Sequence, residues 1–206
     1  MMRIRIFFQK NEPLRYSSFL DIQKIWERTC RRAQLQIEMS KGFNPQAKIQ
    51  IANPLATGFT GRNEIVDIWL TQNLPIALIK EKFTSSLPEG LIINTIESVP
   101  DEKSSDLKSV NESNYSVLFF EEPFSKIENS IKSIMQAEKI IRTRNGKQYD
   151  LRPLIKAMKI EEKTKDYINI IMSLSAGPNK TGRPDEVVLE MGLSLADCKI
   201  DRLDFS

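Results

Sequence analysis

The chain has 206 residues, of which 40% are hydrophobic and 28% are charged, and its formal net charge is +3. This is the composition of a soluble globular protein, and the length fits one domain or two small ones. The sequence contains no histidine and only two cysteines, Cys30 and Cys198, so it excludes imidazole-based catalysis and gives no plausible zinc site.

The first elements in chain order are a strand and an amphipathic helix. Residues 3–9 alternate between basic and apolar side chains before a second apolar run, as a half-buried strand does. Ser17 or Ser18 can cap the helix that follows. Five residues recur at helical spacing and are expected to face the core, namely Phe19, Ile22, Trp26, Cys30 and Ala33.

The next elements complete an N-terminal half. Residues 47–52 and 64–71 alternate as strands, and we expect residues 58–63 between them to form a loop. Pro75 is placed to open a second helix. The apolar stripe of that helix is Ile76, Ile79, Phe83 and Leu87. Residues 91–99 read as a strand.

Residues 101–114 are polar and Ser-rich, which is typical of a linker. A strand at 115–120, a helix from Pro123 to about 137 and a strand at 139–144 follow, and Asn145-Gly146 is a strong hairpin signal. The remaining elements are three strands, a short helix and a closing strand, at residues 148–155, 156–162, 167–175, 183–191 and 199–205.

Both halves therefore run strand–helix–strands–helix–strand, which is the split β-α-β order of ferredoxin-like folds. We predict an α+β protein with two ferredoxin-like halves, residues 1–100 and 115–206, each with a mainly antiparallel sheet and room for one extra strand. A single continuous sheet shared by both halves is the main alternative.

The first helix carries a candidate anion site. Arg28, Arg31 and Arg32 lie at positions i, i+3 and i+4, close enough on a helix to form one patch. Arginine suits bidentate contact with phosphate or carboxylate. The alternative is structural: these cations complement the helix dipole or pair with Asp21, Glu27 or Glu38.

Residues 40–45, Ser-Lys-Gly-Phe-Asn-Pro, are a candidate binding loop. Gly42 permits a positive φ, and Phe43 could serve as a stacking platform for single-stranded RNA. The alternative is a plain connector with Phe43 buried. The predicted ligand or nucleic-acid contacts are Arg15, Arg28, Arg31, Arg32, Lys41, Gly42, Phe43, Asn44 and Lys48.

Secondary candidates are Asp21, Arg152, Arg183 and Asp185. Asp21 lies in a first helical turn, and Arg183-Pro184-Asp185 is standard helix-start chemistry, so structural roles are the favoured interpretation. An RNA-modifying enzyme with Asp21 or Asp150 as the nucleophile is the least favoured alternative.

Seven segments together resemble one known family. They are LRYSSFLD at residues 14–21, ERTCRRA at 27–33, SKGFNP at 40–45, NPLATG at 53–58, EIVDIWL at 64–70, YDLRPLI at 149–155 and GRPDEVVLEMGL at 182–193. With these segments the chain resembles the radical-SAM-linked protein family, a bacterial domain of unknown function found alone or fused behind B12-binding radical SAM proteins. The family typically has histidine where this chain has Phe19 and Gln46, which weakens any metal-binding or proton-transfer role at those two positions.

The resemblance implies an accessory role beside a radical SAM protein, in a setting related to RNA or ribosomes. We therefore expect a non-catalytic binding module that presents a basic surface to an anionic substrate, with an independent RNA-binding protein as the alternative. No cofactor, metal or membrane partner is expected. The two distant cysteines and the lack of a secretory segment or membrane span predict a cytoplasmic protein with free thiols.

Overall fold

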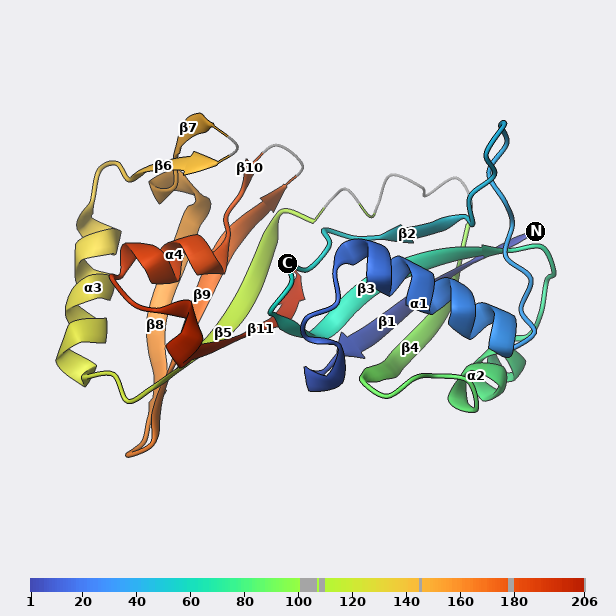
Figure 1. The fold of residues 1–206 in the computed structure, drawn as a ribbon, viewed down its shortest axis with the longest axis horizontal. Coiled ribbons are helices and arrows are strands. Elements are labelled where there is room, and N and C mark those ends of the chain that lie inside the picture. The colour runs from blue at the N-terminus through green and yellow to red at the C-terminus, as the bar shows by residue number, and fades with distance from the viewer. Residues whose placement is uncertain (101–106, 108–109, 145, 178–179, 206) are drawn as a thin grey trace. The chain divides into compact units, whose positions relative to one another are not determined.

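The computed structural model describes residues 1–100, 107, 110–144, 146–177 and 180–205. The chain divides into two compact units, Met1–Ser109 and Val110–Ser206 (Figure 1). Within the predicted linker, residues 101–106 and 108–109 lie outside the described residues.

The first unit has the split β-α-β order. Its elements are β1 (Met2–Lys10), α1 (Phe19–Arg32), β2 (Ile49–Ile51), β3 (Thr60–Leu70), α2 (Ile76–Thr84) and β4 (Leu91–Val99), with a 3-10 turn at Glu12–Leu14. β1 pairs antiparallel with both β3 and β4, and β2 pairs antiparallel with the other edge of β3. The resulting order β4-β1-β3-β2 is ferredoxin-like, as predicted.

Both helices of this unit cover one face of the sheet. Side chains alternate along a strand, so β1 turns Met2, Ile4, Ile6 and Phe8 into the same core as the buried residues of α1 and α2. Trp26 is fully buried at its centre, with its ring edge-on to Phe8 at 5.1 Å and to Phe83 at 6.0 Å between centroids.

The start of α1 follows the sequence signals. Ser18 is the N-cap, and it exchanges hydrogen bonds with Asp21 in a capping box. Ile22, Trp26, Cys30 and Ala33 are buried as predicted. The prediction was wrong for Phe19, which is 39% exposed because it occupies the first turn, at the rim of the core.

The second unit repeats the same order with additions. Its strands are β5 (Glu112–Phe120), β6 (Ile141–Arg144), β7 (Lys147–Asp150), β8 (Ile155–Lys163), β9 (Tyr167–Gly177), β10 (Lys180–Thr181) and β11 (Cys198–Phe205). Its helices are α3 (Phe124–Gln136) and α4 (Pro184–Glu190), with 3-10 turns at Arg152–Leu154 and Leu195–Asp197. β5 pairs with β9 and β11, and β8 pairs with β9, all antiparallel.

The order β8-β9-β5-β11 is again ferredoxin-like, which confirms the predicted fold class. The additions are the β6–β7 hairpin, inserted between α3 and β8, and β10, which pairs with the end of β9. The hairpin is where Asn145-Gly146 predicted it, although Asn145 itself lies outside the described residues.

Several boundaries differ from the predictions, and three of the differences have a clear structural reason. β3 begins at Thr60, so most of the predicted loop at 58–63 is strand; Gly61 pairs with Lys10 of the long β1. β5 begins at Glu112 because its first three residues pair with Ser173–Ser175. The strand predicted at 148–155 stops at Asp150, where the turn containing Pro153 begins.

Three further observations concern the described residues. No helix among them combines the length and apolar character needed to cross a membrane. No group of three or more metal-ligating side chains is gathered within them. Cys30 and Cys198 are both free and buried.

Candidate nucleic-acid interface

A basic stripe runs along the exposed side of α1. Lys24, Arg28 and Arg31 are all exposed and occupy positions i, i+4 and i+7, which lie one above another on a helix. Within the described part of the chain, no hydrogen bond or ion pair involves the side chain of Arg28 or Arg31. Lys24 was not among the predicted contacts, although its spacing from Arg28 and Arg31 could have identified it.

Arg32 has a structural role instead. Its guanidinium donates hydrogen bonds to the carbonyl oxygen of Ser86 at 2.7 and 3.1 Å and to Oγ1 of Thr29 at 3.2 Å. These bonds fasten the end of α1 to the chain just after α2. The guanidinium of Arg32 is therefore already engaged by uncharged oxygen atoms of the protein rather than by a carboxylate.

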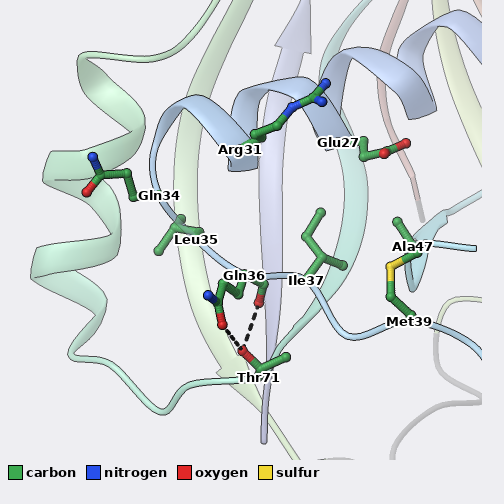
Figure 2. Close-up of a pocket in the computed structure, with 9 residues that line it drawn as sticks. All are labelled: Glu27, Arg31, Gln34, Leu35, Gln36, Ile37, Met39, Ala47 and Thr71. Carbon is green, nitrogen blue, oxygen red and sulfur yellow. Dashed lines mark hydrogen bonds between the residues drawn. The ribbon is translucent and has the colours of Figure 1, made fainter.

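Arg31 and Glu27 of α1 line an open pocket with a volume of about 470 Å³ (Figure 2). The rest of its lining comes from the segment after α1 and from three further positions: Gln34, Leu35, Gln36, Ile37, Met39, Ala47 and Thr71. Oγ1 of Thr71 donates a hydrogen bond to Oε1 of Gln36 at 3.3 Å, which links two of the lining residues. The pocket joins the basic helix to the foot of the 40–46 loop, because Met39 and Ala47 are the bridge from which that loop departs.

The 40–46 loop projects from the first unit, and hydrogen bonds hold its two ends together (Figure 1). The backbone N–H of Ser40 donates to the carbonyl of Gln46 at 2.7 Å, and the N–H of Gln46 donates to Oγ of Ser40 at 2.9 Å. Below them, the N–H of Lys48 donates to the carbonyl of Glu38 at 2.8 Å. These bonds support the loop at its base.

The tip of the loop presents an aromatic ring to solvent. Phe43 has a relative exposure of 111%, so the alternative in which this ring is buried is wrong. Gly42 has φ of +145°, which lies in the region that favours glycine. Lys41 and Asn44 are exposed beside it, and in the described residues Lys41 has no side-chain partner.

Two predicted contacts lie elsewhere. Lys48 pairs with Glu38 at 3.1 Å and lies over the ring of Trp69. Because side chains alternate along this segment, Lys48 points to the opposite face from Ala47 and the pocket. Arg15 lies before α1 and donates to the carbonyl of Gly58 at 2.7 Å; a 14-residue helix is about 20 Å long, so Arg15 is far from Arg31.

The secondary candidates have structural partners. The hydrogen bonds from the side chain and backbone of Ser18 lower the pKa of Asp21. Arg152 donates to the carbonyls of Ile155 and Met135, both at 3.0 Å. The guanidinium of Arg183 donates two hydrogen bonds to the carboxylate of Asp185, at 3.1 and 2.9 Å.

The two aspartates of the enzyme alternative therefore support local structure. Asp21 caps a helix, and Oδ1 of Asp150 accepts hydrogen bonds from the backbone N–H groups of Ile140 at 2.9 Å and Arg152 at 3.1 Å. Neither geometry sets the carboxylate apart as a nucleophile.

A family described as an uncharacterized protein conserved in bacteria, DUF2344, matches residues 3–184. The chain belongs to this family. The comparison with curated proteins gave no match.

The comparison with solved structures found three chains to which this chain is similar. The chain is similar to a chain of an H/ACA RNP bound to a substrate RNA containing 2'-deoxyuridine (TM-score 0.45, 9% identity, covering 88% of this chain and 43% of that one). It is also similar to a chain of a Cbf5-Nop10-Gar1 complex (0.50, 11%, 99% and 48%) and of the archaeal box H/ACA sRNP Nop10-Cbf5 complex (0.40, 12%, 87% and 41%). The likeness to the Cbf5-Nop10-Gar1 chain is one of fold alone, and this chain spans less than half the length of each of these three chains.

Proposed function

We propose that this protein is a non-catalytic binding module whose first unit holds single-stranded RNA against the basic stripe of α1 and the ring of Phe43. The proposal rests on two observations. Arg28 and Arg31 on α1 have no side-chain partner within the described residues, and Phe43 on the 40–46 loop is a fully exposed aromatic ring.

The chemistry of RNA matches both parts of this surface. Guanidinium and ammonium groups contact phosphate oxygens and release condensed counterions, which makes affinity depend strongly on salt. Stacking of a base on an aromatic side chain contributes roughly 1–3 kcal/mol and tolerates any base. The pocket between Arg31 and Met39 connects the two parts, so a strand of a few nucleotides could contact both.

The test is fluorescence anisotropy with labelled single-stranded RNA oligonucleotides over a series of salt concentrations. The R28E/R31E variant is expected to lose most of its affinity at low salt, and the salt slope should fall by about one for each phosphate that the variant no longer binds. Phe43→Ser should weaken binding roughly fivefold or more at all salt concentrations, because stacking is not electrostatic.

The matched control is K80E/K139E, which makes the same change of charge at two exposed lysines outside this surface. If R28E/R31E and K80E/K139E weaken binding equally, the effect is one of net charge alone and the proposed surface is wrong. RNA affinity that is unchanged in R28E/R31E would contradict the proposal directly.

We further propose that the module works beside a radical SAM protein, to which it delivers the bound RNA or a ribosome-related substrate. This rests on the seven segments that resemble the radical-SAM-linked family. The test is co-purification with the radical SAM protein of the same organism, with and without its reconstituted iron–sulfur cluster. Stable association supports the accessory role; no association in either state, together with intact RNA binding, would favour an independent RNA-binding protein.

A further inference from the structure

A second depression, wholly within the second unit, has a different lining. It has a volume of about 460 Å³, within the roughly 300–1,000 Å³ typical of small-molecule sites. Its walls are the β6–β7 hairpin, the 3-10 turn after it, and the ends of β9 and β10: Arg144, Lys147, Tyr149, Asp150, Pro153, Leu154, Lys156, Ser175 and Thr181.

The hairpin presents its functional groups on one face. Arg142 is opposite Tyr149 and Arg144 is opposite Lys147 in the register, and cross-strand partners share a face of a β-ladder. Arg142 forms an ion pair with Glu190 at 3.2 Å, and Arg144 forms one with Glu186. The two glutamates belong to α4. These two ion pairs hold the hairpin against the helix.

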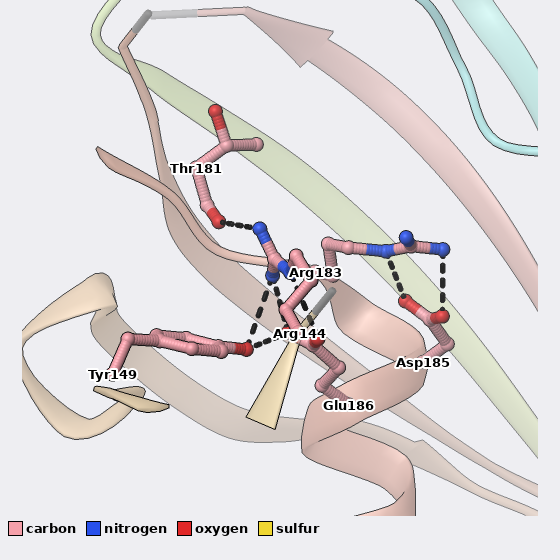
Figure 3. Close-up of polar contacts among 6 residues, drawn as sticks. All are labelled: Arg144, Tyr149, Thr181, Arg183, Asp185 and Glu186. Atoms are coloured by element: carbon pink, nitrogen blue, oxygen red, sulfur yellow. Dashed lines mark hydrogen bonds and ion pairs between the residues drawn. The ribbon is translucent and has the colours of Figure 1, made fainter. Parts of the chain in front are cut away.

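Tyr149 is fixed by a compact polar cluster (Figure 3). Its hydroxyl donates to Oε2 of Glu186, and Arg144 donates to Oε1 of the same carboxylate at 3.0 Å and to the carbonyl of Thr181 at 3.3 Å. The guanidinium of Arg144 also lies 4.8 Å from the centre of the Tyr149 ring. The ring is thereby held at the edge of the depression before any ligand arrives.

Two lysines of the lining have no such partner. Within the described residues, the side chains of Lys147 and Lys156 form no hydrogen bond or ion pair, and both are exposed. Asp150 contributes the carboxylate of the lining, but its Oδ1 accepts two backbone N–H groups. Two ammonium groups are thus left to attract an anion, beside a fixed aromatic ring.

We propose that this depression binds a nucleoside phosphate, with the base against Tyr149 and the phosphate at Lys147 and Lys156. The apolar surface of Pro153 and Leu154 completes the wall for a flat ring. Lysine binds phosphate as a compact point charge, so two exposed ammonium groups can hold a phosphate without bidentate geometry. This site is independent of the RNA surface of the first unit.

The experiment uses the full chain and observes binding by calorimetry and by amide chemical shifts. The probes are the four ribonucleoside 5'-monophosphates, the matching nucleosides and inorganic phosphate. Monophosphates should shift amides around residues 144–156, and K147Q/K156Q should weaken binding roughly tenfold or more. The matched control K139Q/K165Q changes two exposed lysines outside this lining and should retain affinity.

Variants at Tyr149 separate the ring from the fold. Tyr149→Phe keeps the ring and should bind within about twofold, whereas Tyr149→Leu should weaken binding roughly fivefold or more. R28E/R31E should bind mononucleotides normally, so this proposal and the proposed RNA surface can fail separately. Equal affinity for inorganic phosphate, or for the nucleosides, would overturn the nucleotide assignment, and an absence of any monophosphate binding would overturn the site itself.

Discussion

Tyr149 and Glu186 shift each other's proton equilibria. Burial and the hydrogen bond to Glu186 raise the pKa of Tyr149 from 10.0 to about 12. Burial alone would raise the pKa of Glu186, but the hydrogen bonds from Arg144 and Tyr149 outweigh it, so the net direction is downward. At neutral pH the pair is therefore a phenol donating to a carboxylate.

Glu186→Gln is expected to lower the pKa of Tyr149, since the neighbouring negative charge is removed while Arg144 remains. The measurement is a pH titration of the tyrosine Cζ resonances by NMR. In the native chain the raised pKa stabilises the fold fully below pH 10, and this contribution is lost as pH rises to about 12. Tyr149→Phe should lack that loss, and identical titrations in native and Glu186→Gln chains would contradict the assignment.

Single residues were predictable where their partners are local. Ser18 and Asp21 are three positions apart, so the capping box can be read from the sequence. The carbonyl that engages Arg32 belongs to Ser86, 54 residues later, and a backbone oxygen has no sequence signature. Glu38 was considered only as a partner for the arginines of α1, and its pairing with Lys48 was not predicted.

At the level of elements, α1 is held by its apolar side and not by its charges. Trp26 of α1 packs against Phe8 of β1 and Phe83 of α2, so one side chain joins the helix to the sheet and to the second helix. The basic stripe lies on the exposed side of the same helix, which is why changes there should alter binding without unfolding the unit.

Trp26→Ala is expected to destabilise the chain by about 3–5 kcal/mol, because it removes a fully buried ring and leaves a cavity. Urea unfolding followed by circular dichroism measures the change. Leu20→Ala on the same helix, at a side chain that is 61% exposed, serves as the control and should change stability by about 0.5 kcal/mol or less. Equal effects of the two substitutions would show that the Trp26 contact does not organise the core.

Element types were predicted well because hydrophobic periodicity reports them directly, whereas their ends depend on partners. Thr60–Asn63 and Glu112–Asn114 are polar enough to resemble loops, yet both segments lie in strands, and the second is ordered by pairing with β9. The β6–β7 hairpin was predictable from Asn-Gly, but its attachment to α4 was not, because it depends on acids more than 40 residues away in the sequence.

At the scale of the whole chain, two ferredoxin-like units follow one another in the sequence, and each contributes its own strands and helices in the split β-α-β order. The predicted C-terminal half began at 115, which would remove Glu112, Ser113 and Asn114 from β5. Oε2 of Glu112 accepts from Ser173 at 3.1 Å, and Asn114 donates to Asp204 at 2.7 Å. These residues belong to the second unit.

Expressed alone, residues 110–206 are therefore expected to unfold cooperatively and at a clearly higher temperature than residues 115–206. Differential scanning calorimetry of the two fragments provides the comparison. Residues 1–109 should likewise give a cooperative transition of their own. Failure of 110–206 to fold would mean that this unit depends on the first, and equal melting of both fragments would mean that the three residues add nothing.

The placement of the aromatic residues has a practical consequence for spectroscopy. Both native indoles, Trp26 and Trp69, are buried, whereas Phe43 stands in water at the end of its loop. A Phe43→Trp chain would therefore carry one fluorophore with red-shifted emission that iodide can quench, beside two that are shielded. A ligand that covers the end of the 40–46 loop would shield this fluorophore from iodide, so the loss of quenching would report binding directly.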